Sequence, residues 1–383
     1  MMPINLEYSL YIHIPWCVKK CPYCDFNSHE KREDYDEEGY VNALIKDITL
    51  ESQQLKARRL KSIFIGGGTP SLFSAASIGR VLNAVDQQLG IATGIEVSLE
   101  ANPGTAEADK FRALHRIGIN RLSIGVQSFN DSHLQRLGRI HDSEQARRAI
   151  KVAQDVGFTR INLDLMFGLP NQSVAQAVSD IGTALEYQTG HLSHYQLTLE
   201  KNTLFHKYPP ALPQDEIIWD MQTACQKQIS QQLTQYEVSA YAANEQQSQH
   251  NVNYWQFGDY IGVGAGAHGK LTHESGEIHR YWKVKQPREF MNSAGTSESI
   301  GGQNIVIAEE LPFEFMMNAL RLKIGFTLEQ FTQRTYQNAS KVESILVTLL
   351  DKKLLTLNDS RYTCTEHGWN FLNDTLEHFL PGK

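Results

Sequence analysis

Residues 17–24 of the chain read Cys-Val-Lys-Lys-Cys-Pro-Tyr-Cys, which places Cys17, Cys21 and Cys24 within one short stretch. Gaps of three and then two residues let three thiolates reach three corners of one cuboidal iron–sulfur cluster. A structural zinc site needs a fourth ligand, commonly from a second cysteine pair or a histidine pair. The chain has five cysteines and no second pair. We therefore expect a [4Fe-4S] cluster with one open iron, and keep zinc with His13 or His29 as the alternative.

Six short apolar, β-branched runs recur in the first two hundred residues, with segments of helical spacing between them. The runs are 9–14, 62–65, 95–99, 121–126, 161–166 and 191–197. Strands that alternate with helices indicate a parallel sheet with right-handed crossovers. The pattern predicts an α/β fold built on a partial (β/α)6 barrel, and a doubly wound open sheet is the alternative.

Polar, glycine and proline residues gather where these runs end. The cysteines follow the first run, Gly-Gly-Gly-Thr-Pro (66–70) the second, Glu-Ala-Asn-Pro (100–103) the third and Gln-Ser-Phe (127–129) the fourth. Asp164 lies inside the fifth run, and Gly-Leu-Pro (168–170) follows it. In parallel barrels the carboxyl ends of the strands carry the active site. We therefore expect a functional site at this edge.

The later part of the chain has a different character. Residues 215–234 have helical spacing, and residues 275–303 are polar and predicted to be rich in loops. Helices are predicted over 340–353 and 366–379, with a hairpin over 354–365 that turns at Asn358-Asp359. Helices with a small hairpin resemble a winged-helix module. We divide the chain into a barrel (1–235), a barrel-closing segment (236–305) and a winged-helix-like module (306–383).

Composition narrows the class of protein. The chain has 383 residues, is 41% hydrophobic, and carries 36 Lys and Arg against 43 Asp and Glu, a net charge of −7. The acidic balance argues against nucleic acid as the main partner. No apolar stretch reaches the length of a membrane span, and residues 1–8 lack the pattern of a secretory signal, so we expect a cytoplasmic protein.

Cys225 and Cys364 stand in apolar patterns and are predicted to be buried.

The cysteine spacing after the first strand resembles the signature of the radical S-adenosylmethionine (SAM) superfamily. Further motifs resemble its coproporphyrinogen dehydrogenase-like branch and, within that branch, the HemW family of haem chaperones. They are Tyr-Ile-His-Ile-Pro-Trp-Cys (11–17), Cys-Pro-Tyr-Cys-Asp-Phe-Asn-Ser-His (21–29), Gly-Gly-Gly-Thr-Pro (66–70), Glu-Ala-Asn-Pro (100–103), Gly-Val-Gln-Ser-Phe (125–129), Leu-Gly-Arg-Ile-His (137–141) and Asp-Leu-Met-Phe-Gly-Leu-Pro (164–170). The match runs from about Tyr11 to the last residues.

The resemblance implies a set of ligands. The three cysteines match cluster ligands. Positions that match SAM contacts are Tyr11, Tyr23, Gly67, Gly68, Thr69, Glu100, Gln127, Arg139 and Asp164. These residue types suit the ligand, because acids accept from ribose hydroxyls or an ammonium group, and arginine pairs with a carboxylate. Glycine lets the backbone approach a ligand closely.

His-Asn-Val-Asn-Tyr-Trp (250–255) matches the HNxxYW motif of the same family. The resemblance implies that His250 binds haem, and a neutral imidazole is a good axial ligand for haem iron. Tyr254 and Trp255 either line the macrocycle or pack in the core. His268 is a second, weaker candidate for contact with haem or adenosine.

Two departures distinguish the chain from coproporphyrinogen dehydrogenase itself. Phe26 stands where that enzyme has an additional cysteine. That enzyme also has a longer N-terminal segment that helps to bind substrate, whereas only ten residues precede Tyr11 here. The resemblance therefore implies a chaperone that binds haem and passes it to client haemoproteins, which we expect to be respiratory. A radical SAM oxidoreductase acting on a porphyrin is the alternative, so enzyme activity stays open. The family resemblance also implies a homodimer. Transient association with the membrane would suit clients that are bound there.

Overall fold

The computed structural model describes residues 7–32, 35–55, 58–105 and 107–382. The expectation about a secretory signal rests mainly on residues 1–6, which lie outside this range. Six parallel strands pair side by side in the order in which they occur in the chain, as predicted for the partial barrel. They are β1 (Glu7–Ile14), β4 (Arg59–Gly67), β5 (Glu96–Ala101), β6 (Arg121–Gln127), β7 (Ile161–Phe167) and β8 (Gly190–Gln196). The α/β fold is confirmed.

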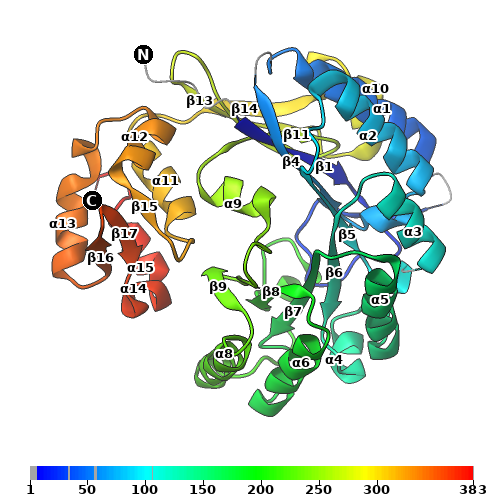
Figure 1. The fold of residues 1–383 in the computed structure, drawn as a ribbon, viewed down its shortest axis with the longest axis horizontal. Helices are drawn as coiled ribbons and strands as arrows, with labels where there is room; N and C mark the ends of the chain where they lie inside the picture. The colour runs from blue at the N-terminus through cyan, green and yellow to red at the C-terminus, as the bar shows by residue number, and fades with distance from the viewer. Residues whose placement is uncertain (1–6, 33–34, 56–57, 106, 383) are drawn as a thin grey trace.

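Helices cover the outer side of this curved sheet (Figure 1). They are α1 (Glu37–Ser52), α2 (Ala75–Leu89), α3 (Ala108–Arg116), α4 (Asp131–Arg136), α5 (Ser143–Val156), α6 (Val174–Glu186) and α8 (Asp215–Ile229). Capping boxes fix the first turns of α5 and α6, each with an acceptor side chain and a glutamine three residues later. The helix predicted over 215–234 ends early, at Ile229, because residue 234 already belongs to β9 (Thr234–Glu237).

The sheet continues beyond the six strands to twelve within the described residues. At one end β11 (Asp259–Val263) pairs parallel with β1, and β12 (His268–Thr272), β13 (Ile278–Lys283) and β14 (Ile300–Ile305) follow antiparallel. At the other end β10 (Ala240–Ala242) pairs with β8 and β9. The loop-rich interpretation of 275–303 is therefore wrong. Its polarity arises because β14 is a largely exposed edge strand, and the short α10 (Pro287–Ser293) lies between the strands.

A buried ion cluster joins this extension to the barrel. The ammonium group of Lys283 on β13 is fully buried and lies 2.6 Å from Asp47 and 2.7 Å from Glu51, both on α1. The Tyr281 hydroxyl donates to the other oxygen of Glu51 at 2.8 Å. Because buried charges are tolerated only when they are paired, this cluster ties the antiparallel strands to α1.

The tail forms a module with its own apolar core. Helices α11 (Leu311–Ala319), α12 (Leu328–Thr335) and α13 (Ser340–Asp351) precede a hairpin of β16 (Leu355–Asn358) and β17 (Arg361–Cys364), to which β15 (Phe326–Thr327) adds a third strand. This order confirms the predicted winged-helix-like arrangement. The last predicted helix is broken at Phe371 into α14 (Glu366–Asn370) and α15 (Leu372–Glu377). The boundaries at residues 235 and 305 stay a prediction.

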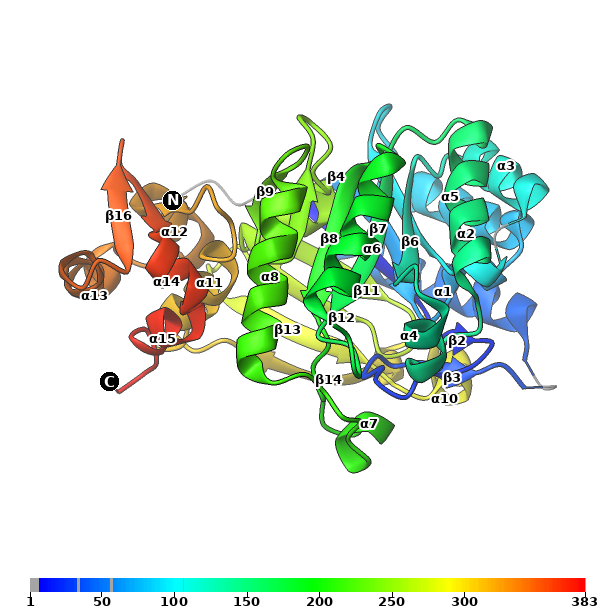
Figure 2. The ribbon, with the colours of Figure 1, turned by 90° about the horizontal axis from the view of Figure 1, so that it is seen from below.

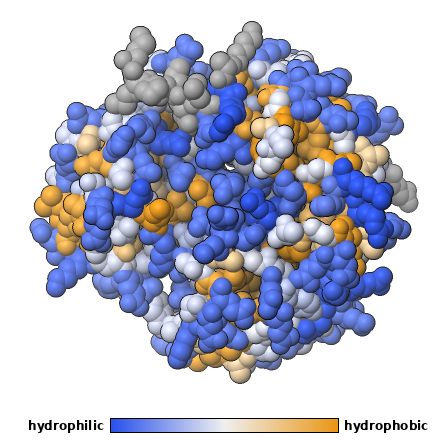
Figure 3. All heavy atoms as spheres, in the orientation of Figure 1, coloured by the Kyte–Doolittle hydropathy of each residue, from blue (hydrophilic) through white to orange (hydrophobic). Residues whose placement is uncertain are grey.

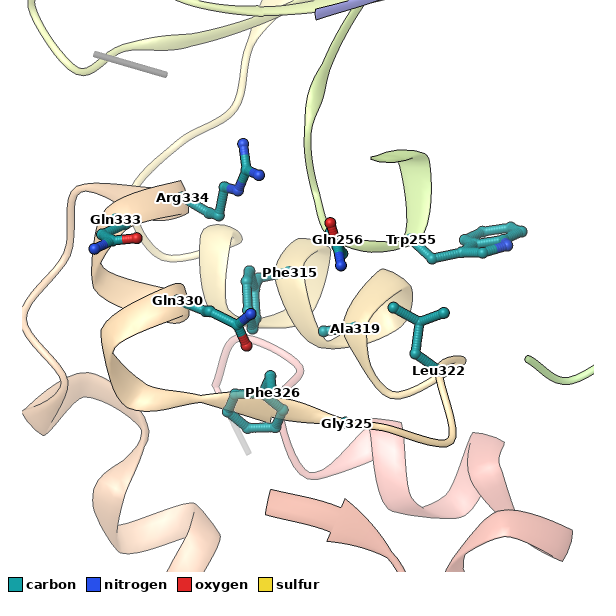
Figure 4. A pocket seen from close by; sticks show the side chains of 10 residues that line it. All are labelled: Trp255, Gln256, Phe315, Ala319, Leu322, Gly325, Phe326, Gln330, Gln333 and Arg334. Carbon is teal, nitrogen blue, oxygen red and sulfur yellow. The ribbon is translucent and has the colours of Figure 1, made fainter. Parts of the chain in front are cut away.

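A cavity of about 250 Å³ lies where this module meets the short α9 (Gln249–Trp255) (Figure 4). Half of the lining residues lie on α11 and α12, including Phe315 and Arg334, and Phe326 of β15 also lines the cavity. None of the cysteines or the predicted SAM contacts lines it. This cavity therefore lies between two parts of the molecule, and Trp255 is the residue of the HNxxYW motif that lines it.

The surface seen in Figure 3 is mainly hydrophilic, with hydrophobic residues in small groups between. No helix in the described part of the chain combines the length and apolar character needed to cross a bilayer.

Cys225 is fully buried on α8, as predicted, whereas Cys364 is only partly buried beside the core of the tail module. The short α7 (Leu204–Lys207) projects at the end of the barrel in Figure 2, and its Phe205 is buried against Leu137, Met166 and Tyr23.

Candidate functional site

The three cysteines lie on one loop at the carboxyl end of β1. Cys17 ends β2 (Trp16–Cys17), which pairs with β3 (His29–Glu30), and the other two lie in the connection between these strands. The ammonium group of Lys20 donates to the carbonyl oxygens of Phe26 and Ser28, each at 3.2 Å, and so closes the loop. All three cysteines remain partly exposed.

A cavity of about 580 Å³ opens beside the cysteines, and we call it the cysteine cavity. The structure brings eight of the nine predicted SAM contacts to its wall together with the three cysteines. These eight are Tyr23, Gly67, Gly68, Thr69, Glu100, Gln127, Arg139 and Asp164. They come from the ends of five different strands and the loops that follow, as expected for the carboxyl face of a parallel barrel.

The glycine loop after β4 packs directly against the strand that carries Cys17. The backbone N–H of Gly68 donates to Ile14 at 2.8 Å, and that of Thr69 donates to Trp16 at 2.8 Å. A Cβ atom on Gly68 would lie 2.6 Å from the carbonyl oxygen of Trp16. Glycine is therefore required here by close backbone approach.

Two buried carboxyl groups face the cysteine cavity. Burial raises the pKa of Glu100 to about 8, an effect increased by nearby Asp164 and opposed by the N–H of Gly67, which donates to Glu100 Oε2 at 2.9 Å. Burial also raises the pKa of Asp164, although Asn162 and Ser123 donate hydrogen bonds to its two oxygens at 2.7 and 3.1 Å. A cationic partner would stabilise the ionised form of both carboxyl groups, because a positive charge offsets the cost of burying that form.

Arg139 and Gln127 complete the wall. Arg139 Nη1 lies 3.6 Å from Cys21 Sγ, and its Nη2 donates to the carbonyl oxygen of Gly125 at 2.9 Å. Gln127 has a positive φ of 69° and accepts a 2.8 Å hydrogen bond from the hydroxyl of Tyr195. The Nε of Arg139 is buried and has no hydrogen-bond partner in the part of the chain that the structure describes.

Sequence reasoning missed several residues of this wall, two of them polar side chains on β8. Ser193 and Tyr195, both on the sixth strand, line the cysteine cavity. Together with His191 they alternate along the strand, so period-two spacing was the signal that identifies the inward face.

The donor set suits a cluster better than a single ion. Among the described residues, no group of three or more His, Cys, Asp or Glu side chains is arranged to hold one metal ion. Both ring nitrogens of His13 are engaged, Nδ1 with the Tyr11 hydroxyl and Nε2 with the carbonyl oxygen of Asn27, each at 2.9 Å. Three thiols that line one cavity without converging on a point match a cluster, in which each thiolate binds a different iron.

A second cavity of about 800 Å³ adjoins the first, and we call it the histidine cavity. The two share part of their lining, including Cys24, Phe26, Glu100 and Trp255. Residues that line only the second cavity include Tyr11, His13, Lys20, Lys201, His250, Tyr254, His268 and Lys285. The structure thus places Tyr11, the ninth predicted SAM contact, beside the predicted haem ligand.

His250 sits at the start of α9, which lies on the concave side of the sheet (Figure 1). Its Nδ1 lies 3.3 Å from the hydroxyl of Ser62, and its ring stacks obliquely on Phe64 at 5.1 Å. Burial lowers the pKa of His250 to about 3, so the ring is neutral at physiological pH. Its Nε2 makes no hydrogen bond to any residue that the structure describes.

The other aromatic candidates have mixed surroundings. Tyr254 packs edge-on against Trp255 at 4.9 Å and lies 5.0 Å from Tyr260, and all three rings line the histidine cavity. They therefore serve packing and cavity lining together. His268 is exposed and stacks on Trp282 at 6.2 Å, so it is held less firmly than His250.

Two family models match this chain. The model of the radical SAM superfamily matches residues 11–181, which include every residue assigned to the cluster and to SAM. The model of the HemN C-terminal domain matches residues 307–371, within the tail module. Membership of the radical SAM superfamily implies a [4Fe-4S] cluster and SAM.

Full-length relatives identify the family. The chain is 45% identical to the heme chaperone HemW of Haemophilus influenzae, over 99% of both chains. It is 46% identical to the heme chaperone HemW of Escherichia coli, over 97% of this chain and 98% of that relative. The chain belongs to the HemW family. The HemW of Bacillus subtilis is 33% identical over 97% of this chain and 99% of its own length.

The fold is shared more widely than the sequence. Coproporphyrinogen III oxidase (HemN) from Escherichia coli, described as a radical SAM enzyme, matches with a TM-score of 0.83 at 19% identity. The match covers 97% of this HemW-family chain and 90% of that enzyme. This likeness shows a common architecture for the barrel and the tail.

Proposed function

We propose that this chain is a haem chaperone that binds haem through His250 and transfers it to client haemoproteins. Its relatives carry the name heme chaperone HemW. The observation that carries the proposal is the state of His250, a neutral imidazole that lines a cavity of about 800 Å³ and whose Nδ1 lies 3.3 Å from the Ser62 hydroxyl. Cavities of roughly 300–1,000 Å³ are typical of small-molecule sites.

The charges around the histidine cavity suit a ligand with carboxylates. Lys20, Lys201 and Lys285 line it, against Asp25 and Glu100. Because burial raises the pKa of Glu100 to about 8, that group is mostly protonated at neutral pH. The balance is positive, which favours the two propionate groups that haem carries.

For the cofactors, we propose that Cys17, Cys21 and Cys24 hold a [4Fe-4S] cluster with SAM beside it. The cluster and SAM together supply one-electron chemistry when they are bound. The residues of the chain bind and orient them. The acids Glu100 and Asp164 suit the ribose or the ammonium group of SAM, and Arg139 suits its carboxylate. Tyr11, Tyr23, Gly67, Gly68, Thr69 and Gln127 complete the proposed SAM contacts.

The decisive experiment is an anaerobic haem titration of the reconstituted protein, run beside an assay with SAM, a reductant and coproporphyrinogen III. We expect stoichiometric haem binding and no turnover of the porphyrinogen. Turnover to protoporphyrinogen without specific haem binding would contradict the proposal and support a radical SAM oxidoreductase. Phe26, in place of an additional cysteine, argues against that alternative.

A matched pair of variants locates the haem site. His250→Ala removes the proposed ligand and is expected to weaken haem binding while the iron–sulfur absorbance stays. His115→Ala, an exposed histidine on the outer helix α3, is the control and is expected to bind haem normally. Unchanged haem affinity in His250→Ala would place the site elsewhere.

The remaining features of this proposal are drawn from the family resemblance. We propose respiratory haemoproteins as clients, tested by haem transfer from the loaded chain to their apo forms. Homodimer formation with the reconstituted cluster, transient contact with a membrane and a cytoplasmic location stay predictions. Sedimentation of apo and reconstituted protein tests the first of these.

A further inference from the structure

A belt of buried polar side chains crosses the inside of the barrel beneath α9. Its members lie on strands next to one another: Ser9 on β1 is opposite Ser62 on β4, which is opposite Glu96 on β5. Farther along the sheet Asn162 on β7 is opposite His191 on β8, and Tyr236 follows on β9. All six are 6% exposed or less. Burying polar groups is costly unless each finds a partner, so their partners show what the belt does.

The belt holds the start of α9. The carboxylate of Glu96 accepts from the backbone N–H of Gln249 at 3.1 Å and from that of His250 at 3.2 Å. The hydroxyl of Tyr236 accepts from the N–H of Ser248 at 3.4 Å. These N–H groups have no acceptor within the helix, because they belong to its first turn. The backbone that presents His250 is therefore fixed to the barrel.

The charge of Glu96 is itself compensated. Arg121 Nη1 lies 3.8 Å and Arg160 Nη1 3.7 Å from Glu96 Oε2. Arg121 also donates to the carbonyl oxygen of Gln246 at 2.9 Å, just before α9. Glu96 thus has charged partners on the sheet side and backbone donors on the helix side.

At the other end, the belt reaches the ring of His250. Ser9 Oγ lies 2.7 Å from Ser62 Oγ, and Ser62 Oγ lies 3.3 Å from His250 Nδ1. A histidine that ligates a metal through Nε2 carries its proton on Nδ1 and donates it to a neighbouring acceptor. Ser62 Oγ is placed to accept that hydrogen bond, and its own hydroxyl can then donate a hydrogen bond to Ser9.

We propose that Ser62 and Glu96 are positioning residues for haem binding, Ser62 for the ring of His250 and Glu96 for its backbone. This inference rests on the proposed function, because it assumes that His250 Nε2 binds the iron. Neither residue lines the histidine cavity, so both act through His250. Neighbours of this kind typically change metal affinity by roughly 10–100-fold when they are removed.

The test compares two buried serines. Ser62→Ala removes the acceptor, and Ser98→Ala is the control. Ser98 lies two residues from Glu96 on β5, is 1% exposed, and has a hydroxyl without a hydrogen-bond partner in the described part of the chain. We measure haem release to excess apomyoglobin and the iron–histidine stretching frequency of the ferrous haem complex by resonance Raman spectroscopy.

We expect Ser62→Ala to release haem about 10-fold faster and to lower the stretching frequency, because the ring loses its hydrogen bond. Ser98→Ala is expected to match the wild type, and Ser9→Ala to show a smaller change in the same direction as Ser62→Ala. Ser62→Thr, which keeps the hydroxyl, is expected to restore the frequency. Circular dichroism and the iron–sulfur absorbance identify variants that do not fold.

Failure of this inference is distinct from failure of the proposed function. If His250→Ala loses haem while Ser62→Ala and Ser9→Ala behave as the wild type, His250 remains the ligand and the inference about Ser62 is overturned. If Ser62→Ala and Ser98→Ala change release equally, the effect is general packing, and the inference is overturned. If His250→Ala keeps its haem, both proposals fall.

Discussion

Arg139 is in direct contact with the cysteine loop, with its Nη1 3.6 Å from Cys21 Sγ. Positive charge and hydrogen bonds to ligand sulfurs favour the reduced form of an iron–sulfur cluster and so raise its reduction potential. We predict that Arg139→Gln lowers the potential of the reconstituted cluster. A redox titration followed by electron paramagnetic resonance measures it.

Arg136→Gln is the matched control for this prediction. Arg136 lies three residues earlier, on α4, and donates to the carbonyl oxygen of Pro170 at 3.1 Å. It does not line the cysteine cavity. We expect its loss to leave the potential unchanged, and an equal shift in both variants would point to a general charge effect in place of the contact with Cys21.

Cluster ligation by the loop cysteines gives a second prediction. Cys24→Ala is expected to abolish the iron–sulfur absorbance near 400 nm on reconstitution, because two thiolates hold a cluster poorly. Cys225→Ala, in the buried face of α8, is the control and is expected to reconstitute normally. A full cluster in Cys24→Ala would overturn the assignment of the three ligands.

The barrel was predictable because its strands are buried on both faces. Apolar, β-branched runs mark such strands, and each of the six runs overlaps an observed strand. The residues at their carboxyl ends were predictable for the same reason, since a parallel sheet brings those ends together. Eight of the nine predicted SAM contacts line one cavity, and the ninth, Tyr11, lines the adjoining one.

The exposed edge strand β14 and the partners of His250 could not be predicted, because they depend on contacts between distant segments. Strand β14 is exposed along most of its length, so its sequence carries no apolar alternation. The partners of His250 are equally hidden, because Ser62 lies 188 residues away in the chain. A lone serine in an apolar run gives no sign of which ring it meets, and only the pairing of β1, β4 and β5 brings the belt under α9.

The glycine loop gives a prediction about stability. Gly68→Ala would place a Cβ atom 2.6 Å from the Trp16 carbonyl oxygen, and backbone on both sides must shift. We expect the free energy of unfolding to fall by about 1–3 kcal/mol, as in other overpacked sites. Gly79→Ala is the control, because its Cβ atom would meet nothing closer than 3.6 Å inside α2.

The control variant Gly79→Ala is expected to change stability in the opposite direction. Alanine is the better helix former, so Gly79→Ala is expected to raise the free energy of unfolding by about 0.5–1 kcal/mol. Urea unfolding followed by circular dichroism measures both variants. A Gly68→Ala protein as stable as the wild type would show that the loop can move away from Trp16.

The raised pKa of Glu100 leads us to predict that the stability of the protein depends on pH. Its pKa of about 8 in the folded protein lies above the ordinary value of 4.5. Between these values the folded chain holds a proton that the unfolded chain releases, so the free energy of unfolding falls as pH rises. Glu100→Gln cannot ionise, and its stability relative to the wild type is expected to increase by more than about 1 kcal/mol from pH 5 to pH 8.

Urea unfolding of the cluster-free protein at both pH values tests this. Glu107→Gln, an exposed carboxyl group at the start of α3, is the control and is expected to change stability equally at the two pH values. The same behaviour in Glu100→Gln would mean that Glu100 titrates normally in the folded chain.

The lysines of the histidine cavity give the last prediction. Lys201 and Lys285 are exposed and line the cavity, where they can pair with the propionates of haem. We expect the double variant Lys201→Met, Lys285→Met to bind haem several-fold more weakly and to discriminate less between haem and its dimethyl ester. Lys341→Met, on α13 of the tail module, is the control. Full discrimination in the double variant would show that the carboxylates of haem face solvent, and that His250 and the aromatic lining hold the ligand alone.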